Sequence, residues 1–242
     1  MGERRRVERE SGFVLHAYPY SETSLLVEVF SRLHGRLPLL AKGARRAGST
    51  LRGSLLAFQP LSFAWMGRGE VRTLTRCEWQ GGHPLLKGDR LLCGFYVNEL
   101  LMRLLPREDA HEQLFDHYAA AVRGLAGGAD TESVLRSFER RLLQELGYAL
   151  TLDRDAASGA PIEPDRLYRY EPERGPVPVR NGVTPDAGGI VAGRVLLALA
   201  RDDYGDPATA QVAKQLMRVL IDHRLDRQPL HSRTIFRSLQ NL

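Results

Sequence analysis

The side chains whose types and spacing could do chemistry are basic, and they gather in the first third of the chain. Between Arg32 and Arg76 there are nine basic residues and a single acid, Glu70. Arginine and lysine bind phosphate oxygens through charge-assisted hydrogen bonds, so this region could hold the backbone of a polyanion. The candidate phosphate ligands are Lys42, Arg45, Arg46 and Arg52, followed by Arg68, Arg72 and Arg76. The first four lie in residues 42–53, a glycine-containing loop that could also bring backbone N–H groups close to phosphate.

The distribution of charge along the chain supports this interpretation. The 242 residues include 34 Lys and Arg against 29 Asp and Glu, which gives a net charge of +5. The sequence pI of about 9.5 exceeds the value of roughly 9 that is typical of nucleic-acid-binding domains. Residues 1–80 carry 13 basic and 7 acidic residues, so the excess belongs to the N-terminal third. The alternative is a solvated basic face that only keeps the protein soluble.

Five short segments with strand-like patterns must position these side chains. They are residues 11–17, 23–30, 36–41, 58–65 and 71–79. In the second segment Leu25, Val27 and Val29 share one face, and in the last segment Arg72 and Arg76 share one face. Five strands in about seventy residues predict a small closed β-barrel, because closure removes exposed edges.

Aromatic side chains in such a barrel could stack on the bases of a single strand. The candidates are Phe30, Phe58, Phe63, Trp65 and Trp79. The alternative for each ring is a place in the barrel core. No residue pattern here predicts recognition of base edges, so we expect weak sequence preference.

The second part of the chain has a helical pattern. Apolar residues recur at helical spacing over residues 91–105, 109–126 and 131–146, and Asp130 and Gly147 are suitable ends for the third helix. Further helices are expected over residues 190–201, after Asp206-Pro207 and from Ser232.

A proline-rich segment interrupts these helices. Residues 148–187 hold six of the 13 prolines, which predicts an irregular insertion over about residues 149–187. The predicted fold class is therefore α+β. We expect a five-stranded barrel over residues 1–80 and an all-helical domain over residues 81–242 that carries the insertion.

No arrangement of residues predicts catalysis, a metal site or a cofactor. The sequence contains no P-loop, dinucleotide-binding loop or nucleophile elbow. His111 and His117 are six residues apart, so they would not share a helix face as a zinc pair does, and Cys77 and Cys93 fit buried thiols. Two cysteines and no apolar run near the ~20 residues that span a bilayer predict a cytoplasmic protein with no membrane segment.

Six short sequences occur in order between residues 12 and 148. They are Gly12-Phe13-Val14-Leu15, Ser21-Glu22-Thr23-Ser24-Leu25, Ala41-Lys42-Gly43-Ala44-Arg45, Gly67-Arg68-Gly69-Glu70, Tyr96-Val97-Asn98-Glu99-Leu100-Leu101 and Phe138-Glu139-x-x-Leu142-Leu143-x-x-Leu146-Gly147-Tyr148. Together they resemble the bacterial RecO family of recombination mediators over a little more than half of the chain.

The resemblance implies an N-terminal OB-fold followed by a helical domain with an inserted segment. It implies a non-enzymatic, nucleoid-associated protein that binds single- and double-stranded DNA and anneals complementary strands. With its partner RecR, such a protein helps to load the RecA recombinase onto DNA covered by single-stranded-DNA-binding protein. Many members carry a four-cysteine zinc finger in the insertion. This chain has Asp155 and Ser158 where the first Cys-x-x-Cys would be, so zinc is not expected and the element that orders the insertion is left open.

The resemblance also implies a protein contact in the helical domain. The family receives there the acidic, hydrophobic-ended C-terminal tail of the single-stranded-DNA-binding protein, which we expect near Arg136, with Phe138, Leu142 and Leu143 as an apolar wall. An arginine can pair with a terminal carboxylate through its two-pronged guanidinium. The alternative is that Phe138 and Leu142 belong to the helix core.

Two other functions fit the same residues. The barrel could bind RNA, as in a translation or processing factor, and the 2′-hydroxyl is the main feature by which a protein distinguishes RNA from DNA. Alternatively, the basic surface could belong to a protein-interaction adaptor that binds acidic protein tails instead of nucleic acid.

Overall fold

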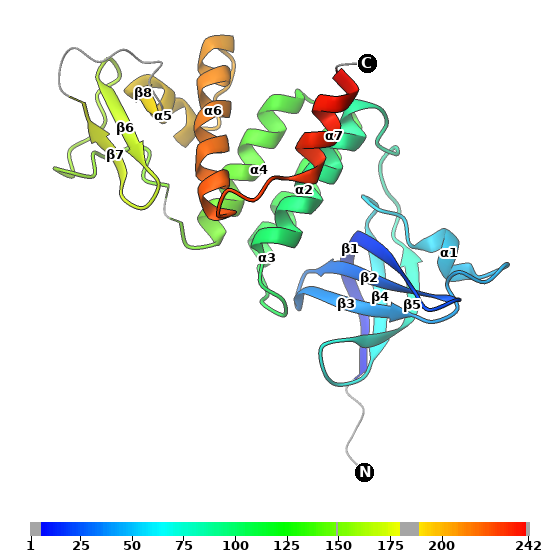
Figure 1. The fold of residues 1–242 in the computed structure, drawn as a ribbon. Helices are drawn as coiled ribbons and strands as arrows, with labels where there is room; N and C mark the ends of the chain where they lie inside the picture. Colours follow the sequence, from blue (N-terminus) through cyan, green and yellow to red (C-terminus); the bar gives the residue numbers. More distant parts are fainter. Residues whose placement is uncertain (1–5, 149, 180–188, 241–242) are drawn as a thin grey trace. The chain divides into compact units, whose positions relative to one another are not determined.

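The structure, a computed structural model, describes residues 6–148, 150–179 and 189–240 (Figure 1). The chain divides into two compact units. The first unit comprises residues 1–129 and 230–242, and the second comprises residues 130–229. Among the described residues, no helix is long and apolar enough to cross a membrane.

The first unit contains a closed five-stranded barrel. Its strands are β1 (Arg6–Tyr20), β2 (Ser24–Ser31), β3 (Gly35–Ala41), β4 (Leu61–Met66) and β5 (Arg72–Trp79). They close in the order β1-β2-β3-β5-β4, with β3 and β5 parallel and the other pairs antiparallel. A short helix, α1 (Thr50–Ser54), lies between β3 and β4, where the sequence predicted only a loop. This topology is that of an OB-fold, which confirms the predicted barrel.

Apolar side chains from all five strands fill the barrel. Val27 and Val29 are fully buried and Leu25 packs against the same cluster, as their alternation predicted. Trp65 and Phe63 of β4 lie in this core as well. The barrel therefore has a dry interior, so any ligand must bind on its outer surface or its loops.

One outer face of the barrel is covered by helices of the same unit. These helices are α2 (Asp89–Leu104) and α3 (Glu112–Gly127), and a further helix of the unit, α7 (His231–Gln240), packs against α2. Phe13 and Phe30 pack against Phe115 and Tyr118 of α3, with ring centroids 5.0–5.9 Å apart. The Asn98 side chain of α2 donates to the Leu15 carbonyl and accepts from Tyr118, both at 2.8 Å.

This packing explains where the chain divides. The barrel and α2, α3 and α7 form one compact unit, whereas the sequence placed a boundary near residue 80. Sequence periodicity identifies the helices, but it does not show which side of the barrel they cover.

Strand β5 departs from the predicted alternation. Its register with β4 shifts between the pairs Ala64–Arg76 and Trp65–Leu74, so Thr75 is an extra residue. Leu74 and Cys77, three residues apart, are both buried as a result. The prediction that Arg72 and Arg76 share one face is therefore wrong.

The second unit combines three helices with a small sheet. Its helices are α4 (Thr131–Glu145), α5 (Gly193–Ala200) and α6 (Pro207–Arg224). Asp130 and Asp206 each accept a hydrogen bond from a backbone N–H three residues on, as N-caps do, which confirms both predicted helix starts. The expected helix over residues 190–201 is shorter, because residues 190–192 form a strand.

The described part of the insertion is more regular than predicted. Strand β6 (Leu167–Glu171) lies between β7 (Gly175–Pro178) and β8 (Ile190–Ala192) in an antiparallel sheet. Pro176 and Pro178 lie on the edge strand β7, where a missing N–H is tolerated. Composition alone therefore obscured a sheet whose prolines lie at its edge. Residues 180–188, which the prediction also included, lie outside the described residues.

The residues at the zinc-finger position do not fit a zinc site. The Asp155 carboxylate accepts hydrogen bonds from the N–H groups of Ala157 (2.6 Å) and Ser158 (3.3 Å) and from Ser158 Oγ (3.0 Å). Both carboxylate oxygens thus bind donors of their own turn, and this turn contains no cysteine. A hydrogen-bonded turn stands where the resemblance placed a metal.

Candidate nucleic-acid interface

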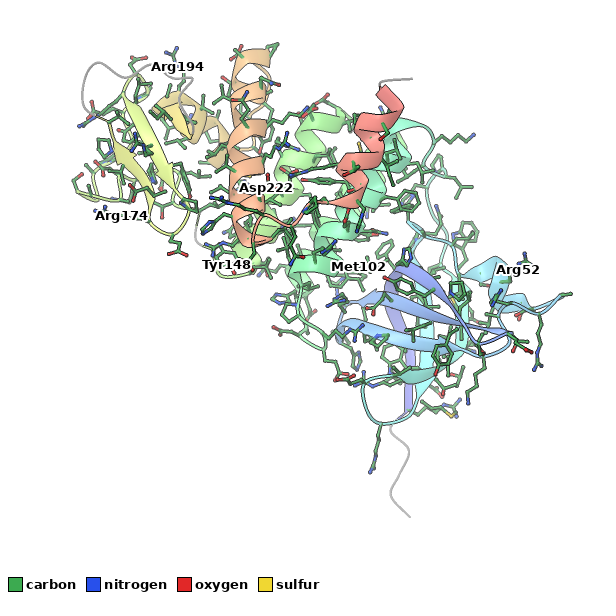
Figure 2. The ribbon with its side chains drawn as sticks, in the orientation of Figure 1. Arg52, Met102, Tyr148, Arg174, Arg194 and Asp222 are labelled. Atoms are coloured by element: carbon green, nitrogen blue, oxygen red, sulfur yellow. The ribbon has the colours of Figure 1, made fainter. Side chains whose placement is uncertain are left out.

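The most basic part of the barrel is the stretch of residues 42–52, here called the basic segment. It begins directly after β3 and continues through a series of turns into α1, on which Arg52 lies (Figure 2). Backbone hydrogen bonds join Arg46 to Gly43 (3.1 Å) and Ser49 to Arg46 (3.2 Å). The segment is therefore an ordered chain of turns instead of an open loop.

Three contacts fix the basic segment to the barrel. Ala44 is fully buried in the barrel core. The Arg45 N–H donates to the Thr23 carbonyl (2.9 Å), and the Arg45 guanidinium donates to the Ser21 carbonyl (2.9 Å). The N–H groups of Ala44, Arg45, Arg46, Ser49 and Arg52 serve internal bonds, so we expect side chains to make most of the phosphate contacts.

The charges of the basic segment are exposed and not neutralised by the fold. Lys42, Arg45, Arg46 and Arg52 are all exposed. Within the described residues, none of these four has a carboxylate within 4.0 Å. The basic segment is therefore a cluster of cations that an external anion can reach.

Two neighbouring arginines have a different role. Arg32 forms a two-pronged pair with Asp116 of α3, with both N–O distances 2.8 Å. Arg36 pairs with Glu28 and donates to the Leu105 carbonyl at 3.0 Å. These charges join the barrel to the adjoining helices, so part of the local positive excess is structural.

The second predicted group of cations is less uniform. Arg68 is exposed on the turn between β4 and β5. Arg72 has a side chain only 17% exposed and pairs with Glu108 at 2.9 Å, whereas Arg76 is exposed and lies 3.6 Å from Glu78. The structure therefore does not bring these three together as it brings together the charges of the basic segment.

Most of the predicted stacking rings lie in the core. Phe30, Phe58, Phe63 and Trp65 are buried, and only Trp79 is exposed, with its indole N–H donating to Gln59. The alternative of barrel core is thus confirmed for Phe63 and Trp65, whereas Phe30 and Phe58 are buried against the helices, next to Phe115 and Phe95.

Sequence reasoning missed two exposed rings on the barrel, Tyr18 and Tyr20 of β1. The signal was present in the sequence. The polar or aromatic residues His16, Tyr18 and Tyr20 take every second position of the strand, and Ala17 between them packs against the barrel core.

The predicted partner-binding residues are buried in the second unit. Arg136, Phe138, Leu142 and Leu143 all have low exposure, and Arg136 pairs with Glu139 at 2.7 Å and donates to the Lys214 carbonyl. These four side chains therefore present no open wall for a peptide in this structure. Their burial favours the helix-core alternative.

The residues considered for other chemistry have structural environments. Burial raises the pKa of the Cys77 thiol to about 12, so this thiol is protonated at neutral pH and a poor nucleophile. Cys93 is buried as well. Across residues 6–148, 150–179 and 189–240, no group of three His, Cys, Asp or Glu side chains is suitable for holding a metal.

The barrel topology, the basic segment fixed to it and the adjoining helices define an OB-fold protein with an accessible cationic surface. Two family profiles match the chain. "Recombination protein O N terminal" matches residues 6–82, and "Recombination protein O C terminal" matches residues 85–234. The chain belongs to the RecO family of DNA repair proteins.

Individual relatives agree over the full length. The chain is 53% identical to the DNA repair protein RecO of Dechloromonas aromatica over 245 residues, with all of both chains covered. It is 50% identical to the protein of the same name from Nitrosospira multiformis, with 99% of each chain covered. For the one from Azoarcus sp. the identity is 51%, and both chains are fully covered.

Proposed function

We propose that this chain binds single- and double-stranded DNA through its basic segment and anneals complementary strands there. The observation that carries the proposal is the set of four exposed cations, none with a carboxylate within 4.0 Å in the described residues, on a segment fixed to an OB-fold barrel. A cation that has no ion pair within the fold loses no internal interaction when it binds phosphate. Its binding also releases counterions from the DNA, which favours association.

Annealing follows from the same physics and needs no catalytic residue. Two complementary strands repel each other through their phosphates until that charge is neutralised. A cationic surface that holds both strands lowers the repulsion, and base pairing then supplies the driving force. The protein acts as a non-enzymatic mediator.

Membership of the RecO family supports a wider role for the chain. We propose that it works with RecR to load RecA onto DNA covered by single-stranded-DNA-binding protein, in the cytoplasm and associated with the nucleoid. The C-terminal tail of the single-stranded-DNA-binding protein is a further proposed partner. Because Arg136, Phe138, Leu142 and Leu143 are buried, binding of that tail at this place requires these side chains to become accessible.

The test compares two triple variants that remove the same charge. Lys42→Ala, Arg46→Ala and Arg52→Ala remove cations from the basic segment, and Arg45 is kept because it also anchors that segment. The control is Arg174→Ala, Arg194→Ala and Arg218→Ala, whose side chains in the second unit are 56–66% exposed (Figure 2). We expect the first variant to lose at least tenfold in affinity for single strands and duplexes, with a parallel loss of annealing rate. Equal affinities for wild type and the first variant would contradict the proposal.

A competition experiment separates DNA from RNA. We expect an unlabelled DNA strand to displace a labelled DNA strand at least as well as an RNA strand of matched sequence. Better displacement by RNA would indicate a contact with the 2′-hydroxyl and favour an RNA-binding function.

A further inference from the structure

Two tyrosines on β1 present their rings to solvent beside the basic segment. Tyr18 is 40% exposed and Tyr20 is 53% exposed, whereas most other aromatic rings of the barrel are buried. The His16 ring lies 4.3 Å from the Tyr18 ring, centroid to centroid, so aromatic character extends along the outside of this strand. The three rings together form an exposed aromatic surface on one strand.

The strand register shows what lies next to these rings. Tyr18 is opposite Leu26 of β2, and Leu26 is opposite Leu40 of β3, so one row across the outer face is aromatic and apolar. Tyr20 is opposite Ser24, and the same register continued by one residue places Lys42 beside Ser24. The aromatic and apolar row thus lies next to the basic segment, whose Arg45 guanidinium donates to the carbonyl of Ser21, the residue after Tyr20.

In the neighbouring row of the same face, the residue opposite His16 on β2 is not accessible. Glu28, opposite His16, is buried between Arg36 and Arg107, with which it forms ion pairs. Burial lowers the pKa of the Arg36 guanidinium, and the neighbouring Glu28 carboxylate acts in the opposite direction. The accessible part of the face is therefore the strip between this ion-pair cluster and the basic segment.

The chemistry of this strip suits unpaired nucleobases. Exposed aromatic rings beside cations are the combination that binds single strands, because the cations contact phosphates while the rings stack on bases, and stacking tolerates any base sequence. A duplex keeps its bases stacked inward, so it can use the cations but not the rings.

We propose that Tyr18 and Tyr20 form a base-stacking platform that makes this protein bind single strands more tightly than duplexes. The proposal rests on the proposed DNA binding by the basic segment. In this arrangement the cations hold the backbone of either substrate, and the two rings add affinity only where bases are unpaired.

A purely structural role makes a different prediction. Cross-strand pairs of an aromatic with an aliphatic residue stabilise sheets, and Tyr18 beside Leu26 is such a pair. In that case, replacing both rings would lower the stability of the barrel and affect both DNA substrates equally.

The experiment measures affinity for labelled oligothymidine and for a hairpin duplex. The double variant Tyr18→Leu/Tyr20→Leu removes the rings but keeps apolar side chains, and Tyr18→Phe/Tyr20→Phe is the matched control that keeps the rings. We expect the leucine variant to lose at least tenfold in single-strand affinity, with duplex affinity within twofold of wild type. The phenylalanine variant should bind both substrates within twofold of wild type. An unchanged single-strand affinity in the leucine variant, or an equal loss on both substrates, would overturn the proposal.

A second measurement does not depend on the variants folding. Irradiation of the wild-type protein with a 5-iodouracil-substituted strand should give crosslinks that peptide mass spectrometry assigns to Tyr18 or Tyr20. Crosslinks confined to other residues would count against the platform. If the proposed DNA binding by the basic segment is itself wrong, the triple variant of that segment will bind both substrates as wild type does. This result distinguishes failure of that proposal from failure of the platform.

Discussion

At the scale of single residues, Asp155 shows how one carboxylate can order a turn through hydrogen bonds. Its carboxylate accepts from two N–H groups and one hydroxyl of the turn over residues 155–158. Burial raises the pKa of Asp155, but the hydrogen bonds from Ala157 and Ser158 outweigh this, and its pKa lies below the ordinary value. The ionised carboxylate therefore stabilises the turn and, through it, the insertion.

This gives a stability that depends on pH. A carboxylate whose pKa is depressed in the folded state stabilises that state above its unfolded pKa of about 3.9, and this contribution is lost as the pH falls through the folded pKa. We expect Asp155→Ala to lower the melting temperature at pH 7, and the difference from wild type to shrink below about pH 4. Thermal unfolding followed by circular dichroism across pH measures this. Asp155→Asn, which keeps an acceptor but no charge, should lose less, and a difference for Asp155→Ala that is equally large at both ends of the pH range would refute the account.

At the scale of elements, the start of β3 is held against the segment between α2 and α3. Gly35 has a φ of 65°, and a Cβ at this position would lie 1.9 Å from the Asp109 carbonyl oxygen. The neighbouring segment cannot easily move away, because the Glu108 N–H donates to the Arg36 carbonyl (2.9 Å) and its carboxylate pairs with Arg72. A side chain at Gly35 would therefore strain the backbone and separate the two segments.

Two glycine substitutions separate these effects. Gly48 also has a positive φ, 78°, but no atom lies within 4 Å of a Cβ built there. We expect Gly48→Ala to cost about 1 kcal/mol from backbone strain alone, and Gly35→Ala to cost roughly 2–4 kcal/mol because overpacking is added. Urea unfolding of both variants measures the difference. Equal costs would show that the contact with Asp109 does not matter.

The elements also show what a sequence pattern can and cannot predict. Alternation identified the barrel strands and their inward residues, because Leu25, Val27 and Val29 belong to a regular strand. Alternation failed for β5, because the extra residue Thr75 moves the residues after it to the opposite face of the strand. The sequence contains no pattern that predicts this bulge. Alternation failed also for Phe30, whose outward face is covered by α3, because coverage depends on contacts between distant segments.

At the scale of the whole molecule, the location of the excess charge could be predicted but not its use. The sequence placed the positive charge in the first third of the chain, and the basic segment indeed presents four exposed cations. Which cations are neutralised depends on partners far away in sequence, as Arg32 with Asp116 shows. The sequence does not predict that the exposed tyrosines lie beside the basic segment, because this also depends on contacts between separate segments, such as the hydrogen bond from Arg45 to the Ser21 carbonyl.

The central claim is that the basic segment contacts phosphates, and the salt dependence of binding tests it most directly. The measurement is the slope of log association constant against log salt concentration for a labelled single strand. Each phosphate contact on a single strand contributes about 0.7 to this slope, so removing Lys42, Arg46 and Arg52 should lower it by about 2. The variant that lacks Arg174, Arg194 and Arg218 should keep the wild-type slope. A slope that is the same for wild type and for the variant of the basic segment would contradict the account.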